Sequence, residues 1–108
     1  MKQLLERVIT ANGINKQLDV AIEELSELLQ AICKIKRREP DECLNEDYLI
    51  NLAEEMADVE IILAELKLLF DNEGNVKEWK NCKLDRLEKR FKEKSGFEIM
   101  SGVYDLSE

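Results

Sequence analysis

The sequence predicts an all-α fold, and three properties of its 108 residues support this class. Leu, Ile, Glu and Lys dominate the composition, and these residue types favour helices or their packing. One Pro and four Gly leave long stretches without a helix breaker. Apolar residues recur at helical spacing along most of the chain. We therefore expect a four-helix bundle in a single domain over residues 1–108, with a core at about 14–94 and a C-terminal tail at 95–108.

The first two predicted helices are separated by a short break. Apolar residues at helical spacing predict a helix over residues 2–11. Asn12 and Gly13 end it, because Gly readily adopts the left-handed cap conformation. The second helix should begin at Asn15, the predicted N-cap, and run to about Arg38.

The third and fourth predicted helices span residues 46–70 and 76–94. Pro40 punctuates the loop before the third helix, and Gly74 lies in the turn that follows it. The tail after residue 94 shows no clear period. We expect it to pack on the bundle or on a partner chain.

Composition excludes several protein classes. A net charge of −8 argues against non-specific binding to nucleic acid. No apolar run approaches the ~18 residues of a membrane span, and the N-terminus lacks the apolar region of a signal peptide. The chain has no His and three Cys without CxxC spacing, so neither a zinc site nor His-based catalysis is expected. We expect a cytoplasmic protein with reduced thiols that binds neither nucleic acid nor membrane.

The charges are unevenly distributed along the chain. Residues 41–75 contain eleven acidic residues and one basic residue, whereas residues 76–95 contain eight basic and four acidic residues. An acidic segment followed by a basic helix could hold a metal ion beside a phosphate group. The alternative is that helices of opposite charge simply pair with each other.

Two pairs of carboxylates stand out on the second and third helices. Glu24 and Glu27 are three residues apart, as are Glu55 and Asp58, so each pair lies on one helix face. At about 100° per residue, Glu24 and Glu55 fall within the apolar arcs of their helices. Glu27 and Asp58 fall at matching edges of those arcs. Face-to-face packing of the two helices would therefore bring four carboxylates together at the margin of the core.

Carboxylates gathered in this way need compensation, because burial and like charges both disfavour their ionised form. A divalent cation would supply it. The alternatives are that Lys or Arg side chains pair with the acids, or that packing turns the acids outward. Without His, the all-oxygen set favours Mg²⁺, with Mn²⁺ also possible. Glu23 and Glu54 lie on the polar sides and are candidates to deprotonate a water molecule.

The third and fourth helices have further surfaces that predict contacts. The back of the third helix has a second apolar strip, formed by Ile50, Ala57, Ile61, Ala64 and Leu68. A helix that is apolar on two sides is buried on two sides, which indicates either an interface with another subunit or a central helix within a monomer.

The basic residues Lys83, Arg86 and Arg90 lie within or beside the apolar face of the fourth helix. Their heads could reach a phosphate or the acidic cluster, or could pair with neighbouring acids.

The order of these motifs resembles that of a known enzyme family. Glu-Glu-x-x-Glu at 23–27, followed by Glu-x-x-Asp at 55–58, resembles the signature of the MazG-like all-α nucleoside triphosphate pyrophosphohydrolases. The flanking segments 17–28, 54–63 and 79–87 are also similar, and the resemblance covers roughly residues 14–94. The absence of His departs from the phosphoribosyl-ATP pyrophosphohydrolase branch.

The resemblance implies a helical bundle that assembles as a homodimer or homotetramer. It implies Mg²⁺-dependent hydrolysis of a nucleoside triphosphate to the monophosphate and pyrophosphate, in nucleotide-pool housekeeping. Glu23 and Glu24 would be catalytic, and Glu24, Glu27, Glu55 and Asp58 would hold the metal. The implied substrate contacts are Gln17 and Asn81 to the base or ribose, and Lys83, Arg86 and Arg90 to the phosphates.

A second hypothesis is a non-catalytic helical interaction module whose acidic face docks a basic partner. A binding-only descendant of an enzyme need not keep every metal ligand. The intact set of four acids therefore favours the enzyme.

Overall fold

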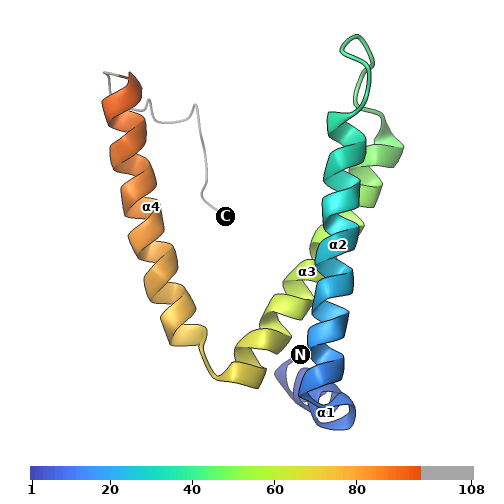
Figure 1. Cartoon of the computed structure of the whole chain (residues 1–108), viewed down its shortest axis with the longest axis vertical. Coiled ribbons are helices and arrows are strands. Elements are labelled where there is room, and N and C mark those ends of the chain that lie inside the picture. Colours follow the sequence, from blue (N-terminus) through green and yellow to red (C-terminus); the bar gives the residue numbers. More distant parts are fainter. Residues whose placement is uncertain (96–108) are drawn as a thin grey trace. The chain divides into compact units, whose positions relative to one another are not determined.

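The computed structural model describes residues 1–95, which form four α-helices and no strand (Figure 1). The predicted all-α class is therefore confirmed for this part of the chain. Helices α1 to α3 form one compact unit, Met1–Asp71, and α4 belongs to a second unit that begins at Asn72. Each unit is described by itself, and the packed four-helix bundle and the single domain stay predictions. None of the four helices is long and apolar enough to cross a membrane. The predicted packing of the tail lies outside the described residues.

The first two helices are joined by one glycine. Helix α1 spans Lys2–Asn12 and helix α2 spans Ile14–Lys36. Gly13 has φ 80°, a left-handed conformation that strains residues with a Cβ atom. Its carbonyl accepts the amide of Gln17 at 3.1 Å, so α2 starts at once and the N-cap is Gly13. The prediction of an Asn15 cap was wrong, because Asn15 lies inside the first turn.

Helix α3 spans Glu46–Phe70, as predicted, and its start is well capped. The Asn45 side chain accepts the Tyr48 amide at 2.9 Å, and two acidic residues occupy the first turn. Asp71 follows with φ 49°, in the left-handed region.

Helix α4 spans Glu73–Ser95, so the turn is shorter than predicted and Gly74 is helical. One left-handed residue already ends α3, and the longer turn is unnecessary. Ser95, assigned to the tail from the sequence, is the last residue of α4.

Helices α2 and α3 lie side by side and run in opposite directions (Figure 1). Helix α1 packs against both of them at the end where α2 begins. The buried apolar residues of the unit are Leu5, Ala21, Ala31, Val59 and Ile62. The facing sides of α2 and α3 are therefore held together by packing on both sides of the acidic positions.

We expect Asn45→Ala to lower the free energy of unfolding by about 1 kcal/mol, because the Tyr48 amide loses its acceptor at the start of α3. Urea denaturation followed by circular dichroism measures this change. Asn45→Asp keeps an acceptor oxygen and should retain the stability. Equal losses in both variants would contradict the capping role.

Candidate metal centre

The four predicted carboxylates converge between α2 and α3. One oxygen from each of Glu24, Glu27, Glu55 and Asp58 lies within 4.8 Å of the other three. All four side chains are half-buried. The cause is the packing of two antiparallel helices whose acidic pairs occupy matching positions relative to the core. The matching arcs in the sequence predict this convergence, whereas the binding of a metal stays a prediction.

The cluster is electrostatically unfavourable without a cation. Desolvation by burial raises the pKa of Glu24, and the neighbouring Glu27 and Asp58 raise it further. The pKa of Glu55 is raised by the same causes in the same order. Oε2 of Glu24 and Oε2 of Glu55 are buried and have no hydrogen-bond partner. Within residues 1–71, no Lys or Arg forms an ion pair with the four acids. The alternative of basic partners is therefore not realised in this unit.

The donor set fits a hard divalent ion. Mg²⁺ and Mn²⁺ prefer carboxylate oxygens, and the four side chains offer nothing else. The two buried oxygens without partners are the atoms that a cation would satisfy. Glu24, Glu27, Glu55 and Asp58 are thus the residues that could hold Mg²⁺ or Mn²⁺.

The acids next to the cluster differ from its members. Glu23 and Glu54 are exposed, although each is adjacent in sequence to a cluster residue and contributes to raising its pKa. Their carboxylates are therefore open to water beside the cluster, as the helical positions predict.

The predicted phosphate contacts lie on α4. Lys83, Arg86 and Arg90 are exposed and line one groove with Lys80, Leu84 and Leu87. Asn81 is exposed and does not line this groove. All four predicted contacts belong to the second unit, and their roles stay predictions.

Gln17 is in a buried polar network. Its side chain is 1% exposed. Asn12 Nδ2 donates to Gln17 Oε1 at 2.7 Å, and Gln17 Nε2 donates to Glu65 Oε2 at 2.6 Å. Gln17 and Glu65 line a pocket of about 170 Å³ that also touches Glu24 and Asp58. Gln17 thus lies beside the acidic cluster.

Sequence reasoning missed Asn12 and Glu65. Glu65 follows Asp58 by seven residues, just as Glu24 follows Gln17. Residues seven apart share a helix face, so this spacing was a signal that could have revealed Glu65. No comparable signal pointed to Asn12, because it ends a different helix.

Comparisons with protein-family models, curated proteins and solved structures find no match to the chain. The proposed function is therefore based on the chemistry of the cluster and of its neighbours.

The raised pKa values of Glu24 and Glu55 predict a pH dependence of the metal-free protein. The folded state keeps protons on these carboxyls above the ordinary pKa of 4.5, whereas the unfolded chain releases them. This contribution to stability is complete below pH 4.5 and is lost as the pH rises through the raised values. Urea denaturation with a chelator, from pH 4.5 to neutral pH, measures the slope. The double variant Glu24→Gln/Glu55→Gln should have a smaller slope.

Glu60→Gln is the matched control, since Glu60 is an exposed acid of α3 outside the cluster. It should retain the wild-type slope. An unchanged slope in the double variant would show that the cluster does not govern the pH dependence.

Proposed function

We propose that the chain is a Mg²⁺-dependent nucleoside triphosphate pyrophosphohydrolase, with Mn²⁺ able to replace Mg²⁺. The observation that best supports this proposal is the cluster of four carboxylates with two buried, unpartnered oxygens. The order of the acids in the sequence adds its resemblance to the MazG-like enzymes. Glu24, Glu27, Glu55 and Asp58 are the proposed metal ligands.

A divalent ion explains how an acidic site would receive an anionic substrate. Four carboxylates repel a triphosphate, and bound cations reverse the local sign of the charge. When bound, the ions also stabilise charge on phosphate oxygens and lower the pKa of a coordinated water. The half-buried position of the four acids strengthens these interactions, because less solvent screens them.

The proposed reaction breaks the anhydride between the α- and β-phosphates. The oxygen of a water molecule forms a bond to one of the two phosphorus atoms, and the bridging oxygen leaves with the other phosphoryl group. The products are the nucleoside monophosphate and pyrophosphate. One proton of the water passes to a carboxylate.

Glu23 and Glu54 are the candidates to accept that proton, since both are exposed acids adjacent to proposed ligands. The proposed substrate contacts are Gln17 beside the cluster and Asn81, Lys83, Arg86 and Arg90 on α4.

We expect Glu24→Gln and Asp58→Asn to lower kcat/KM for triphosphate hydrolysis by about a hundredfold or more, because the proposed ion loses a ligand. The assay incubates the full chain with Mg²⁺ and a panel of nucleoside triphosphates, and it identifies pyrophosphate and monophosphate as products. Mg²⁺ should raise the Tm of the wild type and not that of the variants. The exposed acid Glu60 supplies the control variant Glu60→Gln.

Full activity in Glu24→Gln, or release of inorganic phosphate without pyrophosphate, would contradict the proposed function. No turnover and no Mg²⁺-dependent Tm shift would instead favour the interaction module. A larger loss in Glu23→Gln than in Glu54→Gln, or the reverse, identifies the proton acceptor.

We also propose that the chain assembles as a homodimer or homotetramer. One side of α2 has an apolar stripe with alternating spacings of four and three residues, as in helix–helix interfaces. Its members are exposed within the first unit, Ile22 to 67% and Leu29 to 61%. The full stripe is Leu18, Ile22, Leu25, Leu29 and Ile32.

The back strip of α3 supports the same proposal. Ile50, Ala57 and Ile61 are exposed there, whereas Ala64 and Leu68 are half-buried. Exposed apolar surface of this extent on two helices is typical of an interaction surface.

The variant Ile22→Lys/Leu29→Lys should shift the wild-type oligomer towards monomer, because two charges would enter the apolar stripe of each subunit. Light scattering coupled to size-exclusion chromatography measures the mass in solution. Leu44→Lys is the control, since Leu44 is an exposed apolar residue of the loop between α2 and α3. A monomeric wild type would contradict the assembly.

A further inference from the structure

A pocket of about 170 Å³ opens beside the acidic cluster in the first unit. Two proposed metal ligands, Glu24 and Asp58, form part of its wall, so the pocket and the cluster are neighbours. All three helices of the unit contribute to it. The remaining wall residues are Val8, Asn12, Gln17, Val20, Ile61, Ile62 and Glu65.

The size of the pocket matches one aromatic ring. A protein cavity of about 150 Å³ accommodates benzene, a single six-membered ring. A purine has two fused rings and needs more space. The apolar side chains Val8, Val20, Ile61 and Ile62 provide surfaces for the faces of a ring.

The polar part of the pocket offers a hydrogen-bond acceptor. Glu65 is only 7% exposed, and its Oε2 accepts from Gln17. Within the described residues, its second oxygen Oε1 has no hydrogen bond. This oxygen is not enclosed by the protein, so it is free to accept a hydrogen bond from an N–H group of a molecule in the pocket. Gln17 is itself held by Asn12, so it fixes the carboxyl of Glu65 in place.

The pocket and the cluster form successive layers along α2 and α3. Gln17 precedes Glu24 by seven residues on α2, and Glu65 follows Asp58 by seven residues on the antiparallel α3. Seven residues are two turns, or about 10 Å along a helix. A nucleotide has its base at one end and its phosphates at the other, so a base in the pocket would place the phosphates near the cluster.

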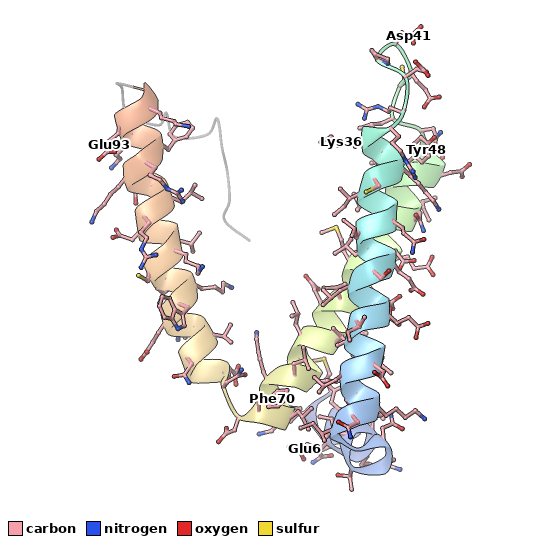
Figure 2. The ribbon with its side chains drawn as sticks, in the orientation of Figure 1. Glu6, Lys36, Asp41, Tyr48, Phe70 and Glu93 are labelled. Atoms are coloured by element: carbon pink, nitrogen blue, oxygen red, sulfur yellow. The ribbon has the colours of Figure 1, made fainter. Side chains whose placement is uncertain are left out.

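The other end of the α2–α3 pair carries both basic and acidic side chains. Lys34 follows Glu27 by seven residues, next to a surface hollow. The hollow is lined by Tyr48, by the basic Lys34, Arg37 and Arg38, and by the acidic Glu39 and Glu42. Figure 2 shows Lys36 and Tyr48 at this end, opposite to Phe70 and the α1 residue Glu6. The Lys and Arg side chains of this hollow suit the outer phosphates of a triphosphate. The base then occupies the Glu65 end.

We infer that this pocket binds the nucleobase of the substrate, that the base is a pyrimidine, and that Glu65 accepts a hydrogen bond from the 4-amino group of cytosine. Gln17, which lines the pocket as a proposed substrate contact, also holds Glu65 in position. The inference rests on the proposed function. A carboxylate pairs with the cytosine amino group, whereas uracil and thymine present a carbonyl oxygen at that position. Two acceptors would then face each other, and the site would discriminate against these bases.

The test measures base preference in two ways with the full chain. Calorimetric titration with dCMP, dUMP and dAMP reports binding without turnover, and kcat/KM for the matching triphosphates reports hydrolysis. We expect cytosine nucleotides to be favoured about tenfold or more in both measurements. Glu65→Gln should reduce this preference, because the amide can present either a donor or an acceptor. The Mg²⁺-dependent Tm shift should be unchanged, since Glu65 is outside the cluster.

Two further variants separate the base site from other effects. Val8→Phe should weaken all nucleotides by filling the pocket while keeping the Mg²⁺-dependent Tm shift. Glu60→Gln, at an exposed acid of α3 that does not line the pocket, should keep the wild-type preference.

Equal affinity of the wild type for the three monophosphates, or a purine preference, would overturn the inference even if Glu65→Gln failed to fold. An unchanged preference in Glu65→Gln would also overturn it. Hydrolysis without base preference would leave the proposed function intact. Cytosine-selective binding without hydrolysis would overturn the proposed function and retain the pocket as a nucleotide site.

Discussion

Four carboxylates held between α2 and α3 are the constraint on which the rest of the first unit depends. Their mutual repulsion and partial burial oppose folding, as the raised pKa values of Glu24 and Glu55 show. Packing of the buried residues Ala21, Ala31, Val59 and Ile62 opposes this repulsion. The unit is therefore less stable than it would be with apolar side chains at these four positions. Such a loss of stability is common where function requires concentrated charge, as in the proposed metal site.

The short helix α1 has a clear structural role beside this site. It packs at one end of the α2–α3 pair and supplies Val8 and Asn12 to the pocket. Asn12 then holds Gln17, and Gln17 holds Glu65. The left-handed Gly13 makes this geometry possible, because it turns the chain from α1 into α2 within one residue. The N-terminal segment thus belongs to the proposed substrate site as well as to the core.

Several features could be predicted from local patterns. Apolar residues at helical spacing after the Pro40 loop predicted α3, and the bounds of this helix were predicted correctly. The predicted starts of α2 and α4 were less accurate, because the backbone conformation of a single residue decided where each helix begins. Gly13 displaced the expected Asn15 cap, and the left-handed Asp71 made Gly74 helical. In both places a single positive φ angle replaced a longer connection.

The sequence by itself determined which acids share a helix face, because helical periodicity is a property of each segment alone. It therefore predicted that Glu24 with Glu27, and Glu55 with Asp58, would meet if the helices packed face to face. Only the tertiary structure decided what lies two turns away from them. The antiparallel alignment of α2 and α3 pairs Gln17 with Glu65, and the packing of α1 adds Asn12. Such contacts depend on the register between helices, which periodicity within one helix does not contain.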